Sequence, residues 1–250
     1  MELNDYLGVL TAEASALAAA ADEAGLDAPV PTCPGWTVAD LVLHTGEVHR
    51  WATAVVASRA TKLGDVPSNS RGPLPERADA VRWFRDGAEK LVETLQSADP
   101  SVAYAAFLND PLTPHLLFWA RRQAMETGMH RVDAESALGR QAPFDPVVAT
   151  DGIDEFLTGF LPRSRTPLHA DAPRSLQIAP DHSERRWTVA IGDDVPVTVR
   201  AATDADCTVT GAASDIYLAL WNRGPVDALC VTGDSAVIDL VRDNVHIRWA

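Results

Sequence analysis

The spacing of hydrophobic residues changes between the two halves of this chain, and this change limits the possible folds more than any other feature. Up to about residue 140, apolar residues recur every three or four positions, as on one side of an α-helix. The first such set is Leu7, Leu10, Ala14, Leu17 and Ala21. After a segment rich in Pro and Gly at 139–146, apolar and polar residues alternate instead, which is typical of half-buried strands. The sequence therefore predicts a helical domain over 1–140 and an α+β domain over 146–250.

The helical half contains the start and stop signals of separate helices. Gly25 is a plausible C-cap for the first one. Thr37, followed by Asp40, resembles a capping box that opens the second. Thr113 and Pro114 suit the N-cap and first turn of the fourth. The second, third and fourth helices are predicted over about 38–60, 77–97 and 114–138, with a loop over 64–76. Four helices of this length, separated by connectors, indicate a four-helix bundle.

The second half mixes strands and helices. Alternating patterns predict strands over 175–179, 187–191, 195–199 and 207–210, with another near Cys230. Helical patterns predict helices over 147–161, 213–221 and 235–242. The predicted fold class is thus α+β with two domains.

The charge of the chain bears on its partners, and its cysteines bear on its location. The net charge is −14, from 35 acidic against 21 basic side chains, and no basic cluster offsets it. Such a surface repels phosphate backbones and anionic lipids, so nucleic acid and membranes are not expected as partners.

No secretory signal or membrane-spanning segment is recognisable. The three cysteines, Cys33, Cys207 and Cys230, form no CxxC pair, which favours a reducing, cytoplasmic location.

Three residues in the helical half can form a metal site. Glu126 and His130 are four residues apart, so they lie one turn apart on one side of a helix and can chelate the same ion. His44 lies on the apolar side of the second helix. Two nitrogens and one oxygen suit Zn²⁺ with a fourth position open for chemistry, although Ni²⁺, Fe²⁺ and Mn²⁺ also accept such ligands. The alternatives are a surface hydrogen bond between Glu126 and His130 and a hydrogen-bonded core histidine at His44.

The polar residues near these three have structural interpretations as well as functional ones. His49 lies about 140° around the helix from His44, so we expect a hydrogen-bonded or exposed histidine and no ligand. Asp133 either orients His130 from behind or lies on a solvated helix surface. Cys33 precedes a helix N-terminus, which can lower a thiol pKa, but a small buried residue is the preferred interpretation. No role is predicted for His115, His169, His182 and His246.

Two motifs resemble those of a known family. Residues 34–44 read PGWTVADLVLH, which resembles the PGWTVxDLVxH motif of the mycothiol-dependent maleylpyruvate isomerase family, a branch of the DinB-like proteins. Residues 126–134 read ETGMHRVDA and resemble its ExxxHRxDA motif, although Val132 stands where the family often has an aromatic or bulky residue, as in HRWD. Residues 214–223 and 231–234 are similar to its sterol-carrier-like C-terminal domain. The resemblance covers nearly the whole chain.

The resemblance implies a fold and an activity. It implies a DinB-like four-helix bundle whose zinc ion is bound by His44, Glu126 and His130, followed by a sterol-carrier-like α+β domain. It also implies mycothiol as thiol cosubstrate at the open zinc position. The thiolate would attack a small electrophile such as a maleylpyruvate-like acid, in an isomerase or a thiol S-transferase. Arg223 corresponds to the arginine of an LWxR motif and is the candidate catalytic residue for binding a substrate carboxylate, in a cleft between the domains. A salt bridge is the alternative for Arg223.

Two other functions remain open at this point. A zinc-bound water would make the protein a metal-dependent hydrolase, with Glu47 or Asp133 as the available general bases. The protein could also bind a small molecule without catalysis. Either a monomer or a homodimer is compatible with the sequence.

Overall fold

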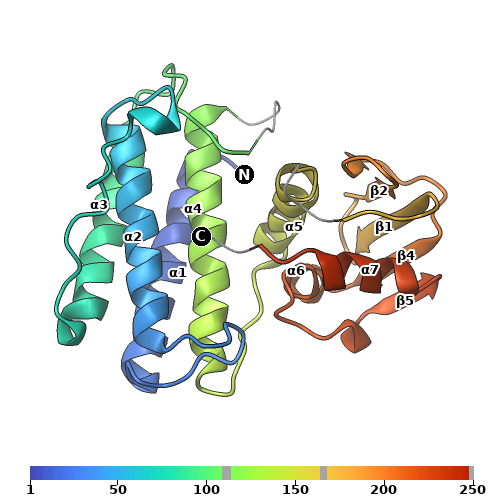
Figure 1. Cartoon of the computed structure of the whole chain (residues 1–250), viewed down its shortest axis with the longest axis horizontal. Coiled ribbons are helices and arrows are strands. Elements are labelled where there is room, and N and C mark those ends of the chain that lie inside the picture. The colour runs from blue at the N-terminus through green and yellow to red at the C-terminus, as the bar shows by residue number, and fades with distance from the viewer. Residues whose placement is uncertain (109–113, 164–167, 248–250) are drawn as a thin grey trace. The chain divides into compact units, whose positions relative to one another are not determined.

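The computed structural model describes residues 1–108, 114–163 and 168–247, and it divides into two compact units (Figure 1). These units are Met1–Ala142 and Pro143–Ala250. The first is helical and the second contains a sheet, so the predicted two-domain α+β fold class is confirmed. Among the described residues, no helix combines the length and hydrophobicity that a membrane span requires.

The first unit is built from long helices that lie side by side (Figure 1). Helix α1 packs against α3 and α4, and α2 packs against α3 and α4. Their bounds are α1 Leu3–Ala24, α2 Val38–Ala57, α3 Ala80–Ser97 and α4 His115–Ser136, with 3-10 turns η1 Leu63–Asp65 and η2 Arg77–Asp79. The apolar side chains predicted from the helical spacing, such as Leu10, Leu17 and Leu41, are fully buried between the helices.

The helix ends follow the capping signals closely. Gly25 ends α1 with a φ of +81°, a left-handed value that glycine adopts without strain. At the start of α2, the Thr37 hydroxyl accepts from the Asp40 amide, and Asp40 Oδ2 accepts from the Thr37 amide at 2.8 Å. This capping box starts α2 at Val38 and so places His44 in its second turn.

Some predicted bounds differ from those observed. Helix α2 ends at Ala57, three residues before the predicted end at 60. Residues 77–79 form the tighter turn η2 before α3 begins at Ala80. Pro114 occupies the N-cap position of α4 and not its first turn, because its ψ of 144° is extended. Thr113, the predicted cap, lies outside the described residues.

The second unit contains a five-stranded sheet in the order β3-β2-β1-β4-β5. Strand β1 pairs in parallel with β4, and the other neighbours are antiparallel. The strands are β1 Arg174–Pro180, β2 Trp187–Ile191, β3 Val197–Val199, β4 Cys207–Gly211 and β5 Cys230–Gly233. The helices are α5 Pro146–Glu155, α6 Ala213–Leu220 and α7 Ala236–Asn244, with a π-helical turn η3 at Phe156–Phe160 and a 3-10 turn η4 at Val226–Ala228.

Two predictions for this unit need correction. The single helix predicted over 147–161 is an α-helix that widens into the π-helical η3. The strand predicted over 195–199 begins only at Val197, because Pro196 has no N–H to donate to a neighbouring strand.

Candidate metal centre

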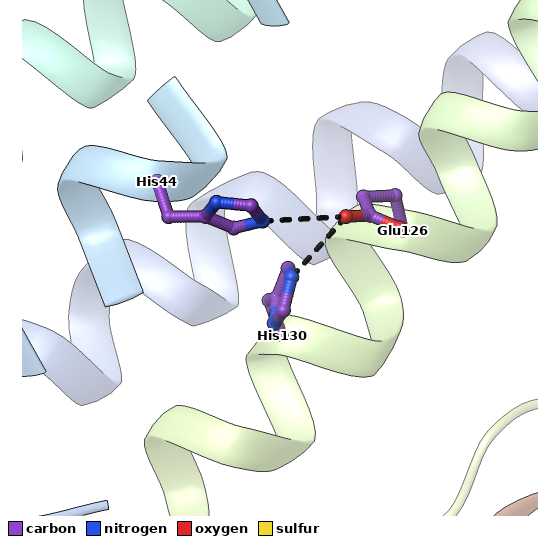
Figure 2. Close-up of side chains that lie close together, drawn as sticks. All are labelled: His44, Glu126 and His130. Atoms are coloured by element: carbon purple, nitrogen blue, oxygen red, sulfur yellow. Dashed lines mark ion pairs between the residues drawn. The ribbon is translucent and has the colours of Figure 1, made fainter. Parts of the chain in front are cut away.

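Helices α2 and α4 bring together the three residues predicted to bind a metal. His44 comes from α2, and Glu126 and His130 come from successive turns of α4 (Figure 2). Glu126 Oε1 lies 3.2 Å from His130 Nε2 and 3.7 Å from His44 Nε2. One potential ligand atom from each residue lies within 4.8 Å of the others, and this is the one such group of three found among the described residues. The prediction that the three side chains converge is therefore supported, while their role as ligands remains a proposal.

The cluster is accessible mainly from the side of His44. Glu126 and His130 are buried, whereas the His44 side chain is 21% exposed. The ring of Trp36, from the connector before α2, packs edge-on against His44 with the ring centroids 5.1 Å apart. His44 is thus the most exposed residue of the cluster.

Asp133 fixes the orientation of His130. Its Oδ2 lies 2.9 Å from His130 Nδ1, and Asp133 is fully buried. Because a carboxylate accepts here, Nδ1 carries a hydrogen, and Nε2 is the ring nitrogen that faces Glu126. Of the two interpretations of Asp133, the structure favours the one in which it orients a histidine.

Arg122 contacts the other oxygen of Glu126. Its Nη2 donates to Glu126 Oε2 at 3.0 Å, and both side chains are buried on α4, one turn apart. The two carboxylate oxygens therefore have different neighbours, a guanidinium at Oε2 and two imidazoles at Oε1. We did not predict this residue, although its i,i+4 spacing from Glu126 was a visible signal.

The charged neighbours of Glu126 and His130 shift the pKa of each residue toward its ionised form. Burial alone would raise the pKa of Glu126, but the two imidazoles and Arg122 hold it well below its usual range. Burial would lower the pKa of His130, but Asp133 and Glu126 outweigh it and raise this pKa to about 9. The site is thus built to keep a carboxylate ionised in the protein interior.

The arrangement fits a divalent cation. Glu126 Oε1 is buried and makes no hydrogen bond of good geometry within the described part of the chain, although two imidazole nitrogens lie close to it. Buried acceptors without donors are rare in proteins and call for an explanation such as a bound ion. One carboxylate oxygen and two imidazole nitrogens are ligands that Zn²⁺ prefers.

His49 is a core residue, as expected for a hydrogen-bonded histidine. Its Nε2 lies 2.8 Å from Thr127 Oγ1, which itself donates to the Gln123 carbonyl oxygen at 2.7 Å. Since that hydroxyl has one hydrogen, His49 Nε2 must be the donor, and Nδ1 carries the lone pair. Nδ1 has no hydrogen-bond partner in the described structure, and burial lowers the pKa of His49 to about 3.

The remaining candidates lie away from the cluster or in the second unit. Cys33 is half-buried against the hydrophobic core of the first unit, which favours its structural interpretation. Val132 is fully buried and lies two residues beyond His130, so it extends from another side of α4. Arg223 belongs to the second unit, where its Nη1 donates to the Trp221 carbonyl oxygen at 2.9 Å. Its contact with a substrate remains a prediction. The histidines without a predicted role, His115, His169, His182 and His246, are not part of the cluster.

Comparisons with known proteins identify a family and a similar fold. Residues 7–135 match the model of the mycothiol maleylpyruvate isomerase N-terminal domain, and residues 147–240 match that of the MDMPI C-terminal domain. The solved structure of the mycothiol-dependent maleylpyruvate isomerase is similar over 93% of both chains, with 15% identity and a TM-score of 0.62. A histidine-to-alanine mutant of that enzyme matches equally well in coverage and TM-score, with 14% identity. The comparison with curated proteins found no match.

Proposed function

Because the chain belongs to the mycothiol maleylpyruvate isomerase family, we propose that it is a metal-dependent and mycothiol-dependent enzyme. The proposed reaction is an isomerisation or a thiol S-transfer on a small electrophilic acid similar to maleylpyruvate. The observation that supports it most directly is the convergence of His44, Glu126 and His130 around one buried carboxylate oxygen (Figure 2).

Each residue of the cluster has a distinct part in this proposal. His44, Glu126 and His130 would hold the zinc ion, and Asp133 keeps His130 in the tautomer that presents Nε2. When bound, zinc would lower the pKa of a thiol and so supply a thiolate for attack on a conjugated double bond. The partly exposed His44 and its neighbour Trp36 form the side from which the thiol and the acid would arrive.

The substrate acid needs a cation that recognises its carboxylate. Arg223 is the proposed residue, because a planar guanidinium donates two parallel hydrogen bonds to a carboxylate. An isomerase and an S-transferase share the attack by sulfur and differ in whether the thiol is later released. The proposed zinc site would serve either reaction.

A hydrolase is the second candidate, and the contacts of Asp133 weigh against it. Asp133 is fully buried and engaged with His130, so it is poorly placed to take a proton from water. Glu47, half-buried on α2, is then the remaining acid that the sequence pointed to. A turnover assay with and without added mycothiol separates the two functions. A non-catalytic small-molecule-binding protein is the third candidate and predicts no turnover in either assay.

The setting of this function is also part of the proposal. We propose a reducing compartment such as the cytoplasm, because the sequence has three cysteines and no CxxC pair. A small-molecule substrate requires no macromolecular partner, and the protein would act as a monomer or homodimer.

The first experiment measures bound metal by elemental mass spectrometry on protein purified without a metal-binding tag. We expect about one zinc per chain in the wild type and its loss in the His44→Ala variant. Mycothiol-dependent conversion of maleylpyruvate is then assayed in both proteins. A wild type that binds no zinc even when zinc is supplied would contradict the proposal.

A further inference from the structure

We infer that Arg122 is a positioning residue for the metal centre, because it engages Oε2 of Glu126 and leaves Oε1 alone to face the two histidines. The inference rests on the proposed metal site and adds a residue to it. It concerns how many ligand atoms Glu126 offers, and hence whether a coordination position stays open for a thiol.

The contacts of Glu126 divide cleanly between its two oxygens. Arg122 Nη2 donates to Oε2 at 3.0 Å, whereas Oε1 lies 3.2 Å from His130 Nε2 and 3.7 Å from His44 Nε2. Arg122 is 1% exposed and Glu126 4% exposed, so water does not compete for these contacts.

A carboxylate can bind a cation through one oxygen or through both. A charge-assisted hydrogen bond from a guanidinium is among the strongest in proteins and ties up one oxygen of the pair. A zinc site with three protein ligand atoms keeps its fourth position for substrate, and a second oxygen from Glu126 would compete for that position. Arg122 thus restricts Glu126 to a single ligand oxygen.

The competing explanation is that Arg122 and Glu126 merely stabilise α4 as an i,i+4 ion pair. The same helix provides a comparison. Arg131 Nη1 donates to Glu135 Oε2 at 2.8 Å, with the same spacing and with both residues buried, but neither is one of the three clustered residues. Arg131 also donates to Glu13 Oε2 at 2.8 Å and to the Ala142 carbonyl oxygen at 2.7 Å. Replacing Arg131 therefore disturbs a more extensive set of buried contacts on α4 without freeing an oxygen of Glu126.

The test counts the nitrogen and oxygen atoms bound to zinc by X-ray absorption spectroscopy. The proteins are zinc-loaded wild type and the variants Arg122→Met, Arg122→Lys and Arg131→Met. Thermal unfolding of each protein verifies that it is folded. If Arg122→Met does not fold, Arg122→Leu, which also offers Oε2 no hydrogen-bond donor, replaces it.

We expect one additional oxygen on zinc in Arg122→Met, since Oε2 becomes available, and a wild-type count in Arg122→Lys and Arg131→Met. An unchanged count in Arg122→Met would overturn the inference. An equal change in Arg131→Met would also overturn it, because the effect would then come from a loosened helix. Absence of zinc from the wild type would instead refute the proposed function, so the two failures are distinguishable.

Discussion

At the scale of single residues, the site depends on side chains that hold the proposed ligands in place. Asp133 and Arg122 each contact one of these ligands, and both are buried on the same helix. Residues behind a metal ligand generally set its tautomer and orientation, and their loss weakens metal binding. Their effects can be measured separately from those of the ligands themselves.

Replacing Asp133 tests the orientation of His130. In Asp133→Ala, the Nδ1 hydrogen loses its acceptor, so both the tautomer and the ring orientation become less restricted. We expect zinc affinity to fall by about 10–100-fold in a competition with a chromophoric chelator. Asp133→Asn, which retains an acceptor oxygen, should lose less. Equal affinities in Asp133→Ala and wild type would show that Asp133 has no such role.

His49 should make the stability of the protein depend on pH. Its pKa of about 3 in the folded state lies below the usual value of 6.5, so the unfolded chain binds the proton more readily. Stability from this residue is therefore complete above pH 6.5 and decreases as the pH falls toward 3. By pH 4 the loss amounts to about 3 kcal/mol.

The variant His49→Gln provides the comparison for this pH dependence. Its amide can still donate to Thr127 but does not titrate, so we expect a shallower decline between pH 6.5 and 4. Urea unfolding at several pH values measures the difference between the two proteins. Identical slopes would mean that His49 is protonated without cost, contrary to its complete burial.

At the scale of the elements, the start of α2 decides where His44 lies. The capping box of Thr37 and Asp40 satisfies backbone donors that would otherwise have no partner at the helix N-terminus. Helix α4 is buried along most of its length, which allows it to contribute both Glu126 and His130 to the interior.

Replacing Thr37 by Ala tests the contribution of this cap. We expect the free energy of unfolding to fall by about 1 kcal/mol, because the Asp40 amide loses its acceptor. Thr94→Ala is the matched control, since the Thr94 hydroxyl bonds back to Lys90 within α3 and caps nothing. A similar loss in both variants, measured by chemical denaturation, would rule out a specific role of the cap.

At the scale of the whole molecule, the proposed metal site belongs to one unit alone. His44, Glu126 and His130 all lie within Met1–Ala142, whereas the sheet lies within Pro143–Ala250. A ligand that binds only the folded state stabilises the part of the structure that forms its site.

Removing the metal should therefore affect the two units differently. With zinc at about 100 times its dissociation constant, the stabilisation is about 2.7 kcal/mol. After chelation, we expect faster amide hydrogen exchange in α2 and α4 and no change in β1, β2 and β4. Faster exchange in the strands as well would show that the metal stabilises both units together.

The helices of the first unit and two of the three clustered residues could be predicted from short-range features of the sequence. Three of these features involve residues close together in the chain: the helical spacing, the capping box at Thr37, and the four-residue interval between Glu126 and His130. Helix geometry alone determines how such neighbours lie in space, so they can be predicted without the tertiary structure. His44 lies far from the other two in sequence, and it was predicted from its place on the apolar side of its helix and from the family motif that ends with it. The later start of β3 was missed although Pro196 marks it in the sequence, whereas the π-helical η3 has no comparable local signal.

Only the tertiary structure decided the features that depend on distant contacts. It placed His44 of α2 within reach of Glu126, put β4 in parallel beside β1, and buried His49 against Thr127. It also divided the oxygens of Glu126 between Arg122 and the histidines. Such arrangements result from burial and packing of the whole unit, which determine how far apart two residues lie regardless of their separation in the chain.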